Sequence, residues 1–211
     1  MDQRQRKRSS GSSTPSKITV DGEFTKLIAE FNSNDDYAAE RSAISLSSYG
    51  ELVTTLLEEL LESEDEDQRW WAIRTFSLLD NPPVNLFIKM LSDKSVEVRK
   101  CATLAIKQHP TELALEKLLE LLSDKDPLLI KLAADALISI GTPAIPGILR
   151  LIEDMEGLGR IEAYRAMAKI GDTRAISVLF NGLNDNSNLI SFWSEEGLTN
   201  LGMNMVYFQT M

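Results

Sequence analysis

Apolar residues recur along the chain at a nearly constant spacing, and they fall into two columns. The first column holds Phe31, Leu61, Leu91, Leu122, Ile152 and Leu183, which follow one another at intervals of 30 or 31 residues. The second column lies four residues earlier, at Leu27, Leu57, Phe87, Leu118, Ile148 and Leu179. Because residues i and i+4 share a face of an α-helix, the columns predict one buried helical face in each of six units.

A third column holds small residues, and it follows a polar linker in each unit. Its members are Ser42, Ala72, Ala102, Ala133, Ala163 and Ser194. The linkers read "NSNDD", "ESEDED", "SDKS", "SDKDP", "EDMEG" and "NDNSN", and their Ser, Asp and Asn residues are typical N-caps. Each unit is therefore predicted to be a helix A, a short linker and a helix B, with Gly141, Gly171 and Gly202 closing units.

One such helix pair cannot bury its apolar face alone, whereas stacked pairs share a continuous core. No segment shows the period-two alternation of a strand. We therefore expect an all-α fold, an α-solenoid of about six helix pairs over residues 22–202, with 22–48 as a degenerate capping repeat. Residues 1–21 are expected to be a disordered basic and Ser-rich tail. The apolar residues 203–211 are expected to strap the last core edge, with a docking segment as the alternative.

Two stretches, "IGTPAIPGILRLIED" and "IGDTRAISVLFNGLND", resemble the HEAT-like repeat family named after phycobilisome lyases. The opening motif of helix A in that family is matched by Gly171, Asp172, Arg174, Ala175, Ile176 and Leu179. Its helix-B motif is matched by Val98, Arg99, Ala102, Ala105 and Ile106, where Ile106 replaces the family's Leu, and in part by Arg160, Ala163 and Ala166. The resemblance covers residues 50–202 well and 22–48 weakly.

This resemblance implies two kinds of function. One is a non-catalytic protein–protein interaction scaffold, which many members of the family are. The other is a phycobilisome-related bilin lyase, or a chaperone-like factor that acts on phycobiliproteins and handles an open-chain tetrapyrrole transiently. In that second case the acceptor cysteine belongs to the substrate, so Cys101 gains no role from it. Because one fold serves many functions, the repeat motif does not choose between them.

Charge is unevenly placed along the chain. Residues 1–17 hold five basic residues and one acid, a net of +4, while the whole chain carries −10, so residues 18–211 carry −14. An acidic body repels phosphate backbones, which counts against nucleic acid as a ligand. The basic run "RQRKR" is expected to be a solubilising tail, and the alternative is that it binds an anionic partner.

The single cysteine and the lack of a long apolar run favour a cytoplasmic protein without a membrane span.

The sequence offers no catalytic or metal-binding constellation. It contains no CxxC, HExxH or P-loop motif. Cys101 shares its repeat position with Trp71, Leu132, Glu162 and Trp193, which indicates a small core residue. His109 is the only histidine and stands beside Pro110 in a predicted turn. We therefore expect no catalytic residue, no metal site and no resident cofactor.

Candidate partner contacts come from helix B, because these helices usually line the concave side of a solenoid. They are Trp70, Glu162, Tyr164, Phe192 and Trp193. Exposed aromatic rings there make binding hot spots or a stacking surface, and the alternative for each is packing between repeats. For Trp71 we expect packing between repeats and no contact with a partner. Glu162 either contacts a partner, reaches solvent or pairs with Arg165, one helical step away.

The acidic run "ESEDED", together with Glu58 and Glu59, predicts a negative knob on the second unit. Such a run is usually a solvated linker. The alternative is that it steers a basic partner toward the solenoid.

Overall fold

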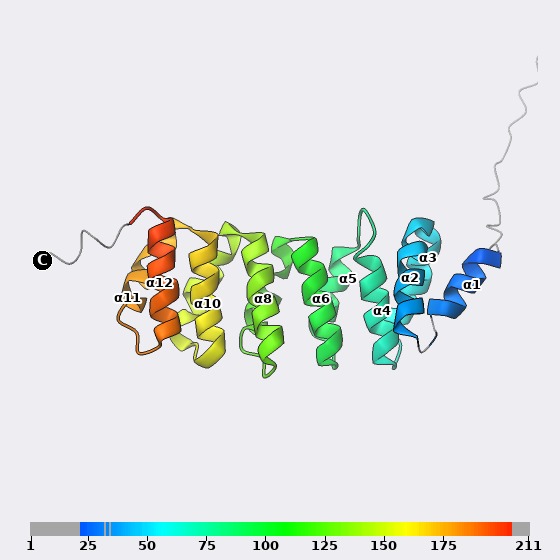
Figure 1. Ribbon diagram of the computed structural model, residues 1–211, viewed down its shortest axis with the longest axis horizontal. Coiled ribbons are helices and arrows are strands. Elements are labelled where there is room, and N and C mark those ends of the chain that lie inside the picture. Colours follow the sequence, from blue (N-terminus) through cyan, green and yellow to red (C-terminus); the bar gives the residue numbers. More distant parts are fainter. Residues whose placement is uncertain (1–21, 32, 34, 204–211) are drawn as a thin grey trace, which may run out of the picture.

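The computed structural model describes residues 22–31, 33 and 35–203, and these form twelve α-helices and no strand (Figure 1). The predicted all-α solenoid is therefore confirmed. Residues 1–21 and 204–211 lie outside the described residues, so the predicted tail stays a prediction, as does the strap beyond Met203.

The helices form six pairs in chain order, as the repeat predicts. The A helices are α1 (Gly22–Phe31), α3 (Glu51–Leu61), α5 (Val84–Met90), α7 (Leu115–Leu121), α9 (Ile145–Leu151) and α11 (Ile176–Gly182). The B helices are α2 (Asp36–Leu46), α4 (Glu66–Phe76), α6 (Val96–Gln108), α8 (Pro127–Ile140), α10 (Gly157–Ile170) and α12 (Asn188–Asn200). Short 3-10 turns are η1 (Ser47–Tyr49), η2 (Glu112–Ala114), η3 (Thr142–Ala144), η4 (Ile152–Asp154) and η5 (Thr173–Ala175).

The predicted columns lie in the core. All six small residues on helix B are fully buried, and the apolar columns are buried except for Leu27 and Leu183, which are half-buried in the first and last units. Only these end units lack a neighbour on one side, which explains the difference.

Three units end at the predicted glycines, with φ of 84° at Gly141, 68° at Gly171 and 80° at Gly202. A positive φ suits glycine because it has no Cβ.

A further glycine sets how closely neighbouring units approach. A Cβ built on Gly159 of α10 would lie 2.1 Å from the carbonyl oxygen of Leu122, which ends the A helix of the preceding unit. No side chain fits in that space, so α10 packs directly against the backbone of the fourth unit.

Arginine–aspartate pairs join consecutive units at the linker edge. They are Arg69–Asp93 at 2.8 Å, Arg99–Asp124 at 3.0 Å and Arg160–Asp185 at 2.7 Å, between nitrogen and oxygen. Burial alone would raise the pKa of Asp93, but Arg69 and the backbone N–H of Ser95 hold it below its usual range. In the fourth unit Ile130 replaces the arginine, and Asp154 makes no ion pair within the described residues. The joint between the fourth and fifth units therefore lacks an ion pair at the linker edge, although Arg165 of α10 pairs with Asp135 of α8 elsewhere along the same joint.

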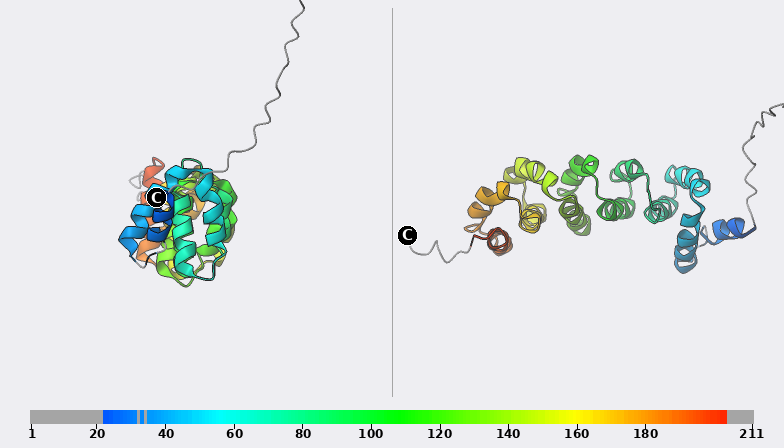
Figure 2. Two further views of the ribbon diagram at one scale, coloured as in Figure 1. Left: turned by 90° about the vertical axis from the view of Figure 1, so that its right-hand side faces the viewer. Right: turned by 90° about the horizontal axis from the view of Figure 1, so that it is seen from above.

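The units are arranged in a gently arched row. Seen from above, the B helices lie along the inner side of the arch and the A helices along the outer side (Figure 2). Neighbouring B helices from α4 to α12 pack against one another, so they form a continuous inner wall. The first pair, α1 and α2, is turned relative to the others at one end of the row (Figure 2).

Among the described residues, no single helix is long and apolar enough to cross a bilayer. The two neighbouring segments Pro127–Ile140 and Thr142–Asp154 are together long and apolar enough for a membrane span. The chain bends by 118° between them.

Leu122 provides a test of the repeat register. It is 1% exposed in the core between the fourth and fifth units. We expect Leu122→Ala to lower the free energy of unfolding by about 2–5 kcal/mol, because it removes buried apolar contacts and leaves a cavity. Urea unfolding followed by circular dichroism measures the change. Leu113→Ala, at an exposed site, is the control and should change stability by less than ~0.5 kcal/mol. A loss below ~1 kcal/mol for Leu122→Ala would contradict the register.

Candidate partner-binding surface

One stripe of each B helix faces away from helix A. Its positions lie five and two residues before the small residue and two residues after it, which places them roughly 160–220° around the helix from the small residue. We call these residues the B-helix stripe. They are Tyr37, Glu40 and Ile44; Asp67, Trp70 and Arg74; Glu97, Lys100 and Leu104; Leu128, Lys131 and Asp135; Leu158, Ile161 and Arg165; and Leu189, Phe192 and Glu196. From α4 to α12 the A helices lie on the outer side of the arch (Figure 2), and the small residues face helix A, so the stripe of these B helices faces the inner side.

Exposed apolar side chains are concentrated on this stripe. Seven large hydrophobic residues are exposed among the described residues: Tyr37, Ile44, Leu104, Leu113, Leu128, Leu189 and Phe192. Six of them belong to the stripe, and only Leu113 lies elsewhere, in the turn before α7. Scattered exposed leucines need no explanation, but their gathering on one face is typical of an interaction surface.

The stripe changes character along the solenoid. In the last three units the first two stripe positions are apolar, except for Lys131. The apolar members are Leu128, Leu158, Ile161, Leu189 and Phe192. Leu128, Leu189 and Phe192 are each about half exposed, at 53%, 54% and 51%. In the second and third units the same positions carry Asp67, Trp70, Glu97 and Lys100. At the first two stripe positions, the last three units are therefore mainly apolar, whereas the second and third units carry charged residues and Trp70. We call the stripe residues of the last three units its C-terminal half.

Two of the predicted contact residues, Trp70 and Phe192, belong to the stripe, and Trp193 stands next to Phe192 in the chain. Phe192 is an exposed member of the stripe, and its ring meets the half-buried Trp193 edge to face at 4.9 Å between centroids. Lys169 of α10 lies over the Trp193 ring at 5.4 Å, so this indole also packs between units. Trp70 is half-buried on the stripe and contacts Trp71 at 4.8 Å.

Glu162 is buried and ion-paired, as one of the alternatives from sequence had it. Its carboxylate accepts a hydrogen bond from Arg165, and Arg165 also donates to Asp135 of α8 at 2.8 Å. Lys107 of α6 reaches the same Asp135 at 2.9 Å. Burial alone would lower the pKa of Arg165, but these carboxylates raise it. Two positive and two negative groups thus link three B helices, and Glu162 has a structural role there.

Tyr164 corrects the expectation of an exposed ring. It is only 3% exposed, because its position beside the small residue points it toward the sixth unit. A Cβ on Gly182 of α11 would lie 2.5 Å from the Tyr164 ring, so the tyrosine fills the space that this glycine leaves. Burial raises the pKa of Tyr164, and Arg160 lies over its ring at 5.5 Å. The ring belongs to the core and is not part of the surface.

The residues with reactive side chains have structural surroundings. Cys101 is buried, and burial raises the pKa of its thiol to about 12, so the reactive thiolate is suppressed. His109 Nε2 lies 2.9 Å from the carbonyl oxygen of Ser77 and ties the third unit to the second. No group of three or more His, Cys, Asp or Glu side chains that could hold a metal ion occurs in the described ranges.

Most of the exposed stripe was missed by reasoning from sequence, although a signal was present. Leu128, Leu158 and Leu189 each stand five residues before the small residue of their unit. Counting five residues back from the small residue on each helix B identifies them, whereas a search for aromatic residues does not. The same count shows that Tyr164, one residue after the small residue Ala163, is not at a stripe position.

Comparisons with known proteins agree with this architecture. The family model for HEAT repeats matches residues 53–138 and again 115–199. The search of curated proteins found no match. Among solved structures, an engineered protein is similar at 20% identity, with a TM-score of 0.51, over 84% of this chain and 95% of that chain. A designed armadillo repeat protein in complex with the peptide (KR)4 is similar at 19% identity, with a TM-score of 0.52, over 83% and 98%. Identities this low show the fold alone.

Glu162→Gln tests the structural role of this carboxylate. The amide keeps the size of the side chain but loses the charge that faces Arg165, so we expect the free energy of unfolding to fall by about 1–3 kcal/mol. Urea unfolding measures the difference. Glu195→Gln, at an exposed site on α12, is the control and should stay within ~0.5 kcal/mol of the wild type. Equal, small effects of both substitutions would show that the Glu162 pair contributes nothing to stability.

Proposed function

Because the chain belongs to the family of HEAT repeats, we propose that it is a non-catalytic scaffold that holds a partner protein on its B-helix stripe. Stacked helical repeats form extended concave surfaces that are well suited to binding another chain. The proposal places the main contact on the apolar C-terminal half of the stripe.

The distribution of exposed apolar side chains carries this proposal. Six of the seven exposed large hydrophobic residues within the described ranges lie on the stripe, three in its first three units and three in its C-terminal half. The C-terminal half also holds the half-buried Leu158 and Ile161, so its first two positions are almost all apolar. Burying a half-exposed leucine or phenylalanine against a partner removes apolar surface from water, which is favourable at roughly 25 cal/mol per Å². The polar chain from Lys107 to Glu162 lies beside these residues and satisfies its own charges, so it does not have to be desolvated unpaired.

A similar fold is used elsewhere for peptide binding, because the designed armadillo repeat protein described above is bound to the peptide (KR)4. The second function implied by the sequence, a bilin lyase or a factor acting on phycobiliproteins, rests on the resemblance alone. A partner that is a phycobiliprotein or another photosynthetic protein remains part of that prediction.

Gentle affinity purification from the native cells tests the proposal. Wild-type chain is compared with a variant that carries Leu128→Gln, Leu189→Gln and Phe192→Gln. We expect a stoichiometric partner with the wild type and at least about a tenfold loss with the variant, because hot-spot residues dominate binding energy. The substituted side chains are exposed, so circular dichroism should show an unchanged fold.

Leu113→Gln is the matched control, because it makes the same kind of change at an exposed leucine off the stripe. It should retain the partner in full. Retention by the triple variant, or equal loss with the control, would contradict binding on the stripe. A visible absorption band in the eluate, together with antenna subunits, would favour the bilin-related function instead.

A further inference from the structure

A second binding feature lies at the N-terminal end of the concave side, where the B helices of the first two units begin. A groove of about 190 Å³ opens there between three residues of the first unit and the N-terminal part of α4 with its N-cap. It is lined by Phe31, Ser33, Asp36, Asp65, Asp67, Gln68 and Trp71. Asp67 is a member of the B-helix stripe, so the groove continues the surface proposed above.

One wall of the groove is aromatic. Trp71 is half-buried, and its ring meets Phe31 edge to face at 6.2 Å between centroids. On its other side Trp71 contacts Trp70 at 4.8 Å with the two rings nearly perpendicular, at 84°. Since Trp70 lies on the stripe, the aromatic wall extends from the groove onto the concave surface. Such a wall binds apolar groups, and its ring faces also attract cations.

The charge of the lining decides which occupant fits this wall. Three lining residues are carboxylates, and no lysine or arginine lines the groove. Asp65 is held in place because its side chain accepts a hydrogen bond from the backbone N–H of Asp67 at 3.0 Å. Within the described part of the chain, Asp36, Asp65 and Asp67 form no ion pair, whereas Glu62 and Glu64 nearby pair with Lys89 and Lys94.

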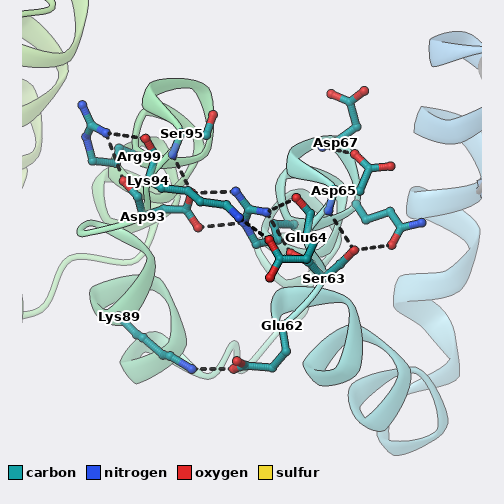
Figure 3. Close-up of polar contacts among 12 residues, drawn as sticks. Glu62, Ser63, Glu64, Asp65, Asp67, Lys89, Asp93, Lys94, Ser95 and Arg99 are labelled. Atoms are coloured by element: carbon teal, nitrogen blue, oxygen red, sulfur yellow. Dashed lines mark hydrogen bonds and ion pairs between the residues drawn. The ribbon is translucent and has the colours of Figure 1, made fainter.

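Figure 3 shows this division of charge. Glu62 and Glu64 extend toward the lysines of the third unit, while Asp65 and Asp67 lie on the other side of the helix and point away from them. The two carboxylates of this linker that are paired with lysines thus face the next unit, whereas Asp65 and Asp67, which form no ion pair within the described residues, line the groove.

We propose that this groove binds a lysine- or arginine-rich segment of a partner protein. One basic side chain lies along the Trp71 ring with its cationic group between Asp36 and Asp67, which both line the groove. A cation gains from both the ring face and the carboxylates, which an apolar or acidic side chain does not. The acidic body also steers such a segment toward the groove. The inference rests on the proposed scaffold function and names the chemistry of one part of its partner.

A purified system tests the proposal. The probe is a fluorescently labelled peptide of alternating Lys and Arg, titrated with the full chain and followed by fluorescence anisotropy. We expect Asp36→Asn with Asp67→Asn to raise the Kd at least about tenfold. The matched control, Glu58→Gln with Glu59→Gln, removes the same charge from exposed residues of the second unit that do not line the groove, and should change the Kd less than about twofold.

A third variant, Trp71→Leu, separates the ring from the charge, and we expect it to raise the Kd about fivefold or more at an unchanged circular dichroism spectrum. Equal weakening by the two double variants, or no effect of either, would overturn the proposal, because the peptide would then follow net charge alone. Should Trp71→Leu unfold the chain, the comparison of the two double variants still decides the outcome.

The chain's own basic run is the competing occupant. Replacing Arg4, Arg6, Lys7 and Arg8 by Ser in the full chain should leave the Kd of the peptide within about twofold. A tighter Kd after this change, by about tenfold or more, would show that the tail occupies the groove in cis and would overturn the assignment to a partner. Because the experiment needs only the purified chain and a synthetic peptide, its result is independent of whether the apolar half of the stripe captures a partner.

Discussion

The close approach of helix B to its surroundings, made possible by one small residue in each unit, is the constraint on which the rest of this structure depends. Six alanine or serine side chains at that position are fully buried. A larger side chain there would separate helix A from helix B and open the core that neighbouring units share. The same position fixes the rotation of helix B, so it determines which residues face the core, which face the adjacent units and which face the concave side. Stability and the binding surface therefore follow from one structural choice.

The four joints from the second to the sixth unit use two different means of attachment. Three joints carry a buried or half-buried arginine–aspartate pair at the linker edge. The joint between the fourth and fifth units lacks this pair and instead brings Gly159 against the backbone of Leu122. Both means hold the B helices side by side, which keeps the concave wall continuous. A rigid wall reduces the entropy that a scaffold loses when it binds.

The repeat register, the helix pairs and their ends could be read from the sequence, because a period of 30 or 31 residues repeats the same local rules six times. The burial of Cys101 followed from its repeat position. The pairing of Glu162 with Arg165, one helical step away, was one of the alternatives that the sequence left open. The burial of Tyr164 did not, because it depends on the space left by Gly182 in another unit. The aromatic groove was equally hidden, since it joins Phe31 to Trp71 across two units.

The most direct test of the account is hydroxyl-radical footprinting of the chain, once purified alone and once isolated gently within its native assembly. The account predicts that Leu128, Leu189 and Phe192 lose reactivity several-fold in the assembly, while Leu113, which is even more exposed, keeps its reactivity. Unchanged reactivity of the stripe together with protection of Leu113 would contradict the central claim, because it would place the partner on the opposite side of the solenoid.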